Sequence, residues 1–485
     1  MRKTLIPSVI TLALVLVPML MNAQAAPQPV LIAVGELTDT RAGSFADLSG
    51  LTNTLENGDP ANLLGGLGSG LAWASGRTFV ALPDRGPNAI NFANVAEGTA
   101  LDNTVTYIPR FHTITMKLEE NRGPGLPFTL VPRLRSTTLL FSSDPLVYGA
   151  ANPALSIPSG VPPQNTAHRH FFTGRSDAFD PTQTSGNPLD ARRDTESIRV
   201  SNDGKHVYIS DEYGPYVDEF ERSTGRHTRS FQLPAHLFVS HLNSIGASEI
   251  SGNTSGRTTN KGMEGLAITP DGKTLVGIIQ AALIQDAAQG KAAKKLLRIE
   301  VIDIVSGQTI HEFAYGLTDG SGVSEITALN NHEFLVDERD GDGRANGDAA
   351  VVKKLFKIDL DGAVDVSNMD GTTAATHVVQ KTLFLDVVQA LVNAGFDPTH
   401  IPAKIEGVAL GEDIEMGHGL GRMHTLWVAN DNDFLAVVPD PLGNPIPNTN
   451  QFFLFGFTDA SLGGSQLVLQ KIHGDGDEDG DRDRD

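Results

Sequence analysis

The chain of 485 residues contains no cysteine, so disulfide bonds cannot contribute to its stability. A chain of this length buries a sizeable hydrophobic core without crosslinks. The length allows two or three average domains, or one large all-β domain. We therefore expect the fold to be stabilised by burial and by bound ions. Beyond residue 21, no apolar run is long enough to span a bilayer.

Basic residues are few compared with acidic ones. Lysine and arginine together number 37, whereas aspartate and glutamate number 58, which gives a formal net charge of −21. A surface with this charge repels nucleic acid and anionic membranes, so we expect neither as a partner. The same charge favours cations. An anionic substrate is still acceptable if metal ions lie in its binding site.

The N-terminus has the pattern of an export signal. Arg2 and Lys3 precede an interrupted apolar run over residues 5–21, and Ala23-Gln24-Ala25 matches a small-residue cleavage site. The pattern predicts a signal peptide over residues 1–25, removed during export to the periplasm or the extracellular space. After cleavage we expect no stable membrane insertion. The alternative is an uncleaved membrane anchor.

One stretch, residues 193–216, reads as a β-hairpin. Strand-like alternation begins at Glu196, Asn202-Asp203-Gly204-Lys205 is a turn sequence, and a second apolar run returns to Asp211 and Glu212. An Asn/Asp-Gly turn between alternating apolar runs is a strong hairpin signal. Because a hairpin returns to where it began, the carboxylates at its two ends lie together. They repel one another unless a cation lies among them.

This hairpin unit recurs along the chain. Copies begin near residues 70, 196, 264, 324 and 406. The first step is about twice the others, and strand-like runs at Phe111–Met116 and Ser136–Phe141 suggest a degenerate copy within it. About six repeated hairpins with few helical patterns indicate an all-β propeller of about six blades over residues 27–473.

The two ends of the chain are expected to close one blade. Pro29–Val34 reads as a strand without a local partner, and Gln451–Phe457 and Leu467–Ile472 read as strands at the other end. Pairing the N-terminal and C-terminal strands removes the open edges of the ring. The acidic tail, residues 474–485, cannot bury anything and is predicted to be disordered, although its spacing matches half of an EF-hand loop.

Three segments look irregular. Residues 142–192 read as a long loop, and residues 281–297 read as a short helix or a polar loop. Leu383–Ala394 has helical periodicity and is predicted to be a helical insertion.

In a propeller the innermost strands line the axis, so acids at their ends converge at one mouth of the channel. A ring of oxygen donors selects hard cations, above all Ca²⁺. The predicted ligands are Glu196, Asp211, Glu212, Glu264, Glu338, Glu406, Asp431 and Asp433, with Asp84 and Asp337 as further candidates. For any single acid, capping a turn or pairing with a nearby base is the simpler interpretation. Recurrence at the same phase of several repeats favours a shared site.

Basic residues accompany these acids. Cations interleaved with metal-holding carboxylates suit an anionic ester such as a phosphate. The predicted anion-binding residues are Arg85, Arg193, Lys261, Arg339 and Lys404. The histidines, among them His168 and His424, show no convincing zinc spacing. The chain has no Gly-x-Ser-x-Gly motif, so a serine hydrolase of the α/β type has no support.

Several motifs together resemble the phytase-like, esterase-like family of exported bacterial proteins. They are Glu196–Tyr216, Lys261–Ala267, Asp337–Asp340, Lys404–Ala409 and Asn430–Phe434, and the resemblance covers roughly residues 60–460. It implies a propeller related to the β-propeller phytases, in which calcium ions hold the substrate phosphate and activate water. Ser197 departs from the motif, which more often has glycine there. The functional roles that the resemblance implies are assigned only to the acidic and basic residues within the matched motifs.

The leading hypothesis is an exported, calcium-dependent hydrolase of phosphate or related esters. Calcium would polarise the ester, the basic residues would hold the anion, and Glu264 or Glu212 would act as general base. One alternative is a calcium-dependent lactonase of the six-bladed kind. Another is a propeller that binds a ligand without catalysis. The substrate, the number of metals and the oligomeric state are left open by the sequence.

Overall fold

The computed structural model describes most of the chain. The described residues are 26–37, 45–88, 104–149, 159–345, 347–416 and 421–473. The predicted signal peptide and the predicted acidic tail lie outside these ranges. Within them, no helix has both the length and the apolar character needed to cross a membrane.

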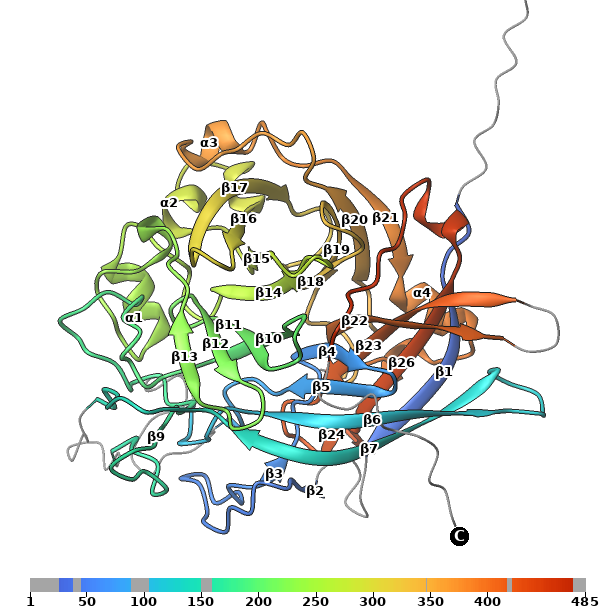
Figure 1. The fold of residues 1–485 in the computed structure, drawn as a ribbon, viewed down its shortest axis with the longest axis horizontal. Coiled ribbons are helices and arrows are strands. Elements are labelled where there is room, and N and C mark those ends of the chain that lie inside the picture. The colour runs from blue at the N-terminus through green and yellow to red at the C-terminus, as the bar shows by residue number, and fades with distance from the viewer. Residues whose placement is uncertain are drawn as a thin grey trace, which may run out of the picture.

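Five four-stranded antiparallel sheets are arranged around a common centre as the blades of a β-propeller (Figure 1). Blade 1 contains β4 (Gly70–Ser75), β5 (Thr78–Leu82), β6 (Arg110–Glu120) and β7 (Phe128–Leu139). Blade 2 contains β10 (Thr195–Val200), β11 (His206–Asp211), β12 (Tyr216–Glu221) and β13 (His227–Ser230). Blade 3 contains β14 (Met263–Ile268), β15 (Thr274–Ile279), β16 (Leu296–Asp303) and β17 (Gln308–Gly316).

The last two blades complete the ring. Blade 4 contains β18 (Gly322–Ala328), β19 (Glu333–Arg339), β20 (Lys353–Asp359) and β21 (Lys381–Asp386). Blade 5 contains β22 (Lys404–Glu415), β23 (Arg422–Asp431), β26 (Asn450–Phe457) and β1 (Val30–Leu37). The first strand of each repeat is innermost, and β4, β10, β14, β18 and β22 contact one another in that order, with β22 returning to β4.

Short elements decorate the loops between the strands. The short strands are β2 (Phe45–Ala46), β3 (Leu63–Leu64), β8 (Phe141–Ser142), β9 (His170–Phe171), β24 (Val437–Pro439) and β25 (Pro445–Pro447). The helices are α1 (Gly246–Gly252), α2 (Ile284–Ala287), α3 (Gly371–Ala374) and α4 (Val387–Asn393), and the 3₁₀ turns are η3 (Ala235–Leu237), η4 (Ala293–Lys295), η5 (Pro398–His400) and η6 (Asp459–Leu462).

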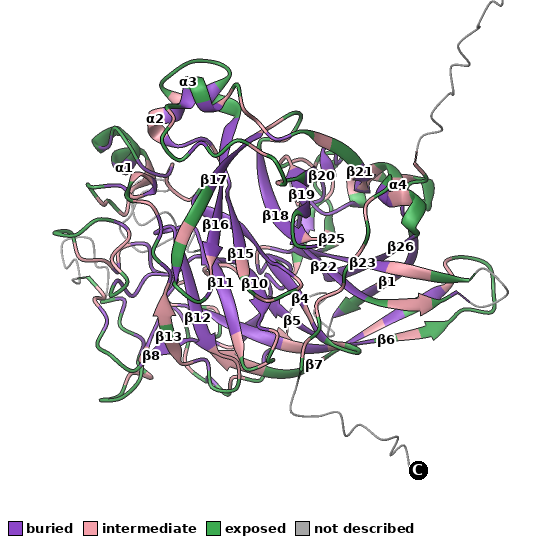
Figure 2. Cartoon of the chain, turned by 45° about the horizontal axis from the view of Figure 1, so that its top comes forward, coloured by how far each residue is buried: buried purple, intermediate pink, exposed green. Residues whose placement is uncertain are grey.

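A hydrophobic layer lies between each pair of neighbouring blades. Between blades 1 and 2, for example, Val80 packs in one cluster with Ile198 and Val207. Equivalent clusters join the other four pairs of blades. The inner strands are therefore buried on both faces (Figure 2), and every residue of β10 and β14 is buried. The buried residues of β10 nevertheless include Glu196, Ser197 and Arg199, so the centre of the ring is not purely apolar.

The prediction of about six blades is wrong, because the suspected sixth repeat belongs to blade 1. Phe111–Met116 lies in β6, which pairs with β5, and most of Ser136–Phe141 lies in β7, which pairs with β6. The long step between the first two repeats therefore consists of the outer half of blade 1 and a long connection. Leu467–Ile472, also predicted as a strand, forms no strand.

The chain ends close blade 5, as predicted. β1 pairs antiparallel with β26, from Val30 opposite Gly456 to Leu37 opposite Asn450. The hairpin of residues 193–216 is also confirmed, with Val200 opposite Val207 and Gly204 at a positive φ of 71° in the turn. The predicted helical insertion is shorter than expected, since Leu383 lies in β21 and α4 begins at Val387.

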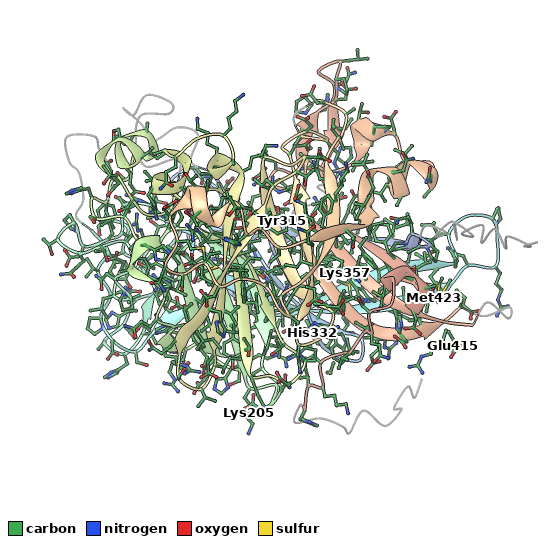
Figure 3. The ribbon with its side chains drawn as sticks, turned by 90° about the horizontal axis from the view of Figure 1, so that it is seen from above. Lys205, Tyr315, His332, Lys357, Glu415 and Met423 are labelled. Atoms are coloured by element: carbon green, nitrogen blue, oxygen red, sulfur yellow. The ribbon has the colours of Figure 1, made fainter. Side chains whose placement is uncertain are left out.

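The segment after η6 crosses the end of the channel where the hairpin turns lie. The Val468 N–H donates to Leu329 O in blade 4, and the Gln470 amide donates to Val200 O in blade 2. Residues 468–470 cover a small cavity lined by Ala72, Arg199 and residues of the other inner strands. We call this end the turn face. Figure 3 shows Lys205, from a hairpin turn, low in the view and Tyr315 higher up.

Candidate functional site

A β-bulge near the start of the inner strand occurs in four blades. The pairing shifts by one residue between Thr195 and Ile198 in blade 2, and equivalent shifts occur in blades 3, 4 and 5. The residues at these shifts are Glu196, Glu264, Ser324 and Glu406. A bulge re-aims a side chain that would otherwise follow the alternation of the strand. This shared distortion explains why a glutamate recurs at the same phase of the sequence repeats.

Opposite the turn face, acidic and basic side chains from all five blades form one cluster, which we call the carboxylate mouth. Its members are Asp84, Arg85, Asp194, Glu196, Glu212, Lys261, Glu264, Arg339, Lys404, Glu406, Asp431 and Asp433. Carboxylates outnumber cations in this set. The predicted convergence of repeat acids at one mouth is therefore present in the structure.

Two carboxylate triads lie within the carboxylate mouth. In the first triad, ligand atoms of Asp194, Glu196 and Glu212 all lie within 4.8 Å of one another. In the second triad, the same holds for Asp84, Asp431 and Asp433. Oxygen-only groups at this spacing fit hard divalent cations, above all Ca²⁺.

The cations of the mouth neutralise the two triads unequally. Lys404 contacts the second triad twice, through an ion pair of 2.8 Å to Asp431 and a second pair to Asp433. The first triad has one ion pair, 2.7 Å long, between Arg85 Nη1 and Asp194 Oδ2. Each triad therefore has one paired cation for three carboxylates, and the first triad has the fewer ion-pair contacts.

Arg339 links blades 3, 4 and 5 at the mouth. Its Nη2 donates to Glu406 and lies 4.0 Å from Glu264 Oε1, and its Nε donates to Ser324 Oγ. Lys261 donates from Nζ to Gln280 Oε1 at 2.9 Å. The contacts of Arg339 place a guanidinium next to Glu264 and Glu406, the glutamates at the bulges of blades 3 and 5.

Burial and mutual repulsion raise the pKa values of the mouth carboxylates. Burial raises the pKa of Glu264 to about 7, with Glu406 adding to the shift. The pKa values of Glu196 and Glu212 are raised well above their usual range, mainly by burial and then by the charge of Glu264. A bound divalent cation would favour the charged forms and reverse these shifts.

Two carboxylate oxygens at the mouth have no donor among the described residues. Glu212 Oε1 and Glu264 Oε2 are both buried and both lack a hydrogen-bond partner. A buried charged oxygen without a partner is costly. These atoms belong to residues in and next to the first triad, so the residues present fit a metal ion there.

The cations reach further into solvent than the acids they accompany. The side chain of Lys404 is 30% exposed and that of its partner Asp431 is 1% exposed. The side chain of Arg339 is 16% exposed and that of Glu264 is 3% exposed. A solvent-borne anion would therefore meet basic groups first, with the buried carboxylates beneath them.

Arg193, predicted to bind an anion, lies elsewhere. Its Nε donates to Asp218 Oδ2 at 2.8 Å, and its guanidinium stacks 3.8 Å from the centre of the Tyr216 ring. The side chain is only 1% exposed. Arg193 therefore stabilises the interior of blade 2, and its predicted role at the mouth is wrong.

Glu338 and Asp211, predicted as metal ligands, have structural partners instead. Residues alternate along β19, so Glu338 faces away from Arg339. It accepts hydrogen bonds from Tyr315 Oη and the Thr318 N–H and pairs with Lys381. Asp211 accepts from the N–H groups of Asp194 and Gly214, and burial raises its pKa to about 8. Asp211 thus positions Asp194.

Asp194 is the triad member that the sequence-based ligand set omitted. It lies directly before β10 and accepts from the Arg85 backbone N–H at 3.1 Å. The available signal was its place two residues before Glu196, in Arg193-Asp-Thr-Glu196. Asp337, a further candidate, is buried with both oxygens lacking a donor among the described residues, and burial raises its pKa well above its usual range.

Below the mouth, the channel is filled by a polar cluster. Glu325 accepts hydrogen bonds from the Ser197 hydroxyl at 2.8 Å and from the Leu266 N–H at 3.1 Å. It also forms an ion pair with Arg199 at 3.0 Å. Glu325 follows the bulge residue of blade 4, as Ser197 follows Glu196 in blade 2. The serine that departs from the glycine of the motif therefore has a specific partner on β18, two blades away in the ring.

Comparisons with known proteins give a family. A family model described as "Phytase-like: Esterase-like activity of phytase" matches residues 62–434. A curated relative from Arthroderma benhamiae, named "Uncharacterized secreted protein", is 34% identical over 183 residues. This match covers 31% of the chain and 35% of the relative, so the chain spans about a third of that protein's length.

Solved structures resemble the chain only distantly. A putative 6-phosphogluconolactonase from Bacteroides fragilis is 12% identical, with 84% of this chain and 85% of that chain covered and a TM-score of 0.29. The hydrazine synthase of Kuenenia stuttgartiensis is 11% identical, with 76% and 78% covered and a TM-score of 0.30. With such low TM-scores, these likenesses carry no argument about function.

Proposed function

Because the chain belongs to the phytase-like family described by esterase-like activity, we propose that it is a calcium-dependent hydrolase of small anionic esters. Phosphate esters are the preferred substrate class. The observation that carries the proposal is the carboxylate mouth, where buried carboxylate oxygens without donors lie directly beneath partly exposed arginine and lysine side chains.

In this proposal the first triad holds the metal. Asp194, Glu196 and Glu212 offer only oxygen donors, and their ligand atoms lie close enough to share one ion. The second triad already pairs with Lys404 through Asp431 and Asp433. When bound, calcium would polarise the ester and lower the pKa of a bound water.

The basic residues of the mouth bind and orient the anion. Arg339 and Arg85 are planar guanidinium groups suited to paired contacts with phosphate or carboxylate oxygens. The neighbouring acids, together with burial, determine the pKa of Lys404. Burial lowers it, but Asp431 and Asp433 raise it well above its usual range, so the ammonium stays charged.

Glu264 is the candidate general base. A base is most effective when its pKa lies near the operating pH. Burial raises the pKa of Glu264 to about 7, and the neighbouring Glu212 carboxyl group interacts with it. Glu212, also predicted for this role, is assigned to the first triad. Export to the periplasm or the extracellular space completes the proposal and is supported by the N-terminal pattern of residues 1–25.

The proposal is tested by assaying the purified full chain against phosphate monoesters, carboxylic esters and lactones. Each substrate is measured with calcium, after removal of calcium by a chelator, and after calcium is restored. We expect phosphate ester hydrolysis that disappears on chelation and returns with calcium. Faster turnover of lactones would instead favour the lactonase alternative. Binding of calcium without turnover of any substrate would favour a ligand-binding propeller.

A further inference from the structure

A second cluster of metal-ligating side chains lies in the outer half of blade 3, on β16 and β17, away from the ring centre (Figure 1). Glu300 on β16 pairs in register with Glu312 on β17, and both are completely buried. Like charges directly opposite one another on a sheet are destabilising, the more so without water. The arrangement therefore requires a compensating group.

The surrounding cation compensates only one of the two glutamates. Arg298 Nη1 donates to Glu312, and its other nitrogens bind Asp286 at 2.9 and 3.0 Å. The two oxygens of Glu300 have no hydrogen-bond partner among the described residues. Burial, and then the charge of Glu312, raise the pKa of Glu300 well above its usual range, so without a cation a proton shared with Glu312 holds the two carboxyl groups together.

A histidine completes the cluster. His236 in η3 lies with Nε2 2.8 Å from Glu312 Oε2, and ligand atoms of His236, Glu300 and Glu312 all lie within 4.8 Å of one another. The His236 side chain is 35% exposed, which gives an ion a path from solvent to the buried carboxylates.

We infer that His236, Glu300 and Glu312 form a zinc-binding site separate from the carboxylate mouth. One imidazole nitrogen with two carboxylate oxygens is a donor set that suits Zn²⁺, whereas Ca²⁺ takes oxygen ligands. A divalent cation at this point would neutralise the unpaired charge of Glu300 and the remaining oxygen of Glu312. Sequence spacing does not reveal the site, because His236 in η3 lies far before the β16–β17 hairpin that carries both glutamates.

The test uses the full chain with calcium in excess, so that sites made only of oxygen donors are filled. Zinc uptake is measured by competition with a chromophoric chelator and by metal analysis after desalting. We expect one equivalent of zinc for the native protein. Glu300→Gln and His236→Ala are each expected to weaken zinc binding at least tenfold.

Two control variants separate this site from others. His311→Ala removes an exposed histidine on the same strand, β17, and Glu264→Gln changes the carboxylate mouth. Both are expected to retain zinc. No zinc uptake by the native protein, or equal uptake by native protein and His236→Ala, would overturn the inference. His236 is partly exposed, so its variant serves even if Glu300→Gln does not fold.

Discussion

At the scale of single residues, the glutamates at the β-bulges, Glu196, Glu264 and Glu406, are the residues most directly tied to the proposed function. Glu264 and Glu406 lie on different blades, yet both contact Arg339. Each is almost completely buried, and each has a raised pKa in which burial is the largest cause. Groups that are costly to keep buried and charged are retained where they serve a function.

Glu264→Gln is expected to lower the rate of ester hydrolysis by about 10²–10⁴-fold, because it removes the proposed general base. Without calcium, its free energy of unfolding is expected to stay equal or rise, since one of several mutually repelling carboxylates becomes neutral. Glu415→Gln, an exposed change at the far end of β22 (Figure 3), is the control. Unchanged hydrolysis by Glu264→Gln would contradict the assigned role.

Ser197→Ala removes one of the donors to the buried Glu325. We expect it to lower the free energy of unfolding by about 1–3 kcal/mol, because a hydrogen bond to a buried charged group is lost. Urea unfolding measures the change, with the exposed Ser248 in α1 as a matched serine-to-alanine control. A loss no greater than that of the control would show that Glu325 does not depend on this hydroxyl.

His112 is expected to make stability depend on pH. It lies buried on β6, and burial lowers its pKa to about 3, whereas in the unfolded chain it has its ordinary pKa of 6.5. Below pH 6.5 the unfolded chain therefore binds a proton that the folded chain does not. As pH falls from 6.5 to 5, this residue is expected to cost about 2 kcal/mol of stability.

The His112→Asn variant should lack this part of the acid sensitivity. The measurement is urea unfolding at pH 7 and pH 5 for the native protein and the variant. His332→Gln is the control, since that exposed histidine pairs with Asp359, which raises its pKa. An equal stability loss in native protein and His112→Asn would refute the prediction.

At the scale of elements, the seam between blades 1 and 5 is tightly packed. Gly68 O accepts a hydrogen bond from the Gly407 N–H at 2.6 Å. A Cβ atom added at Gly68 would lie 2.2 Å from the backbone of Asn430 at the end of β23. A side chain there would push the segment before β4 away from the blade 5 strands, which carry Glu406 and Asp431.

Gly68→Ala is expected to lower the free energy of unfolding by at least about 1–3 kcal/mol, the usual cost of overpacking. Thermal or denaturant unfolding measures it. Gly123→Ala, where an added Cβ meets nothing within 4 Å, is the matched control and should change stability little. Equal stability of the two variants would mean that the seam can relax.

Much at this scale could be predicted from the sequence, because the signals were local. The turn at Asn202–Lys205 and the apolar runs beside it predicted β10 and β11 correctly. The direction of Glu338 could not be predicted, since it depends on which face of β19 meets the axis. Arg193 was equally ambiguous, because its partner Asp218 lies on β12, beyond the predicted hairpin.

At the scale of the whole molecule, the number of blades cannot be predicted from the spacing of the sequence repeats alone. Spacing predicts a further repeat between the first two, whereas the structure has the outer strands β6 and β7 of blade 1 there. Only pairing distinguishes a long hairpin added to one blade from a blade of its own. Closure by the two chain ends was predicted correctly, because an unpartnered strand at each end leaves few other arrangements.

Calcium binding at the first triad is expected to stabilise the folded chain, since the ion binds carboxylates that only the folded blade 2 brings together. At a free calcium concentration 100 times the Kd, the gain is about 2.7 kcal/mol. The Tm should rise with calcium and fall on chelation, and it should respond less in the Glu196→Gln variant. Magnesium at the same ionic strength is the control. A Tm insensitive to calcium would argue against a calcium site at the mouth.

The pairing of β1 with β26 has a consequence for the order of assembly. Blades 1 to 4 are each built from consecutive strands, so they can form as the chain emerges, whereas blade 5 needs a strand from each end of the chain. Blade 5 also carries Lys404, Glu406 and Asp431. A partly synthesised or partly translocated chain therefore lacks the blade 5 residues that complete the carboxylate mouth. The arrangement proposed for catalysis, which includes Lys404, is therefore complete only once the ring has closed, whereas the first triad lies within blade 2.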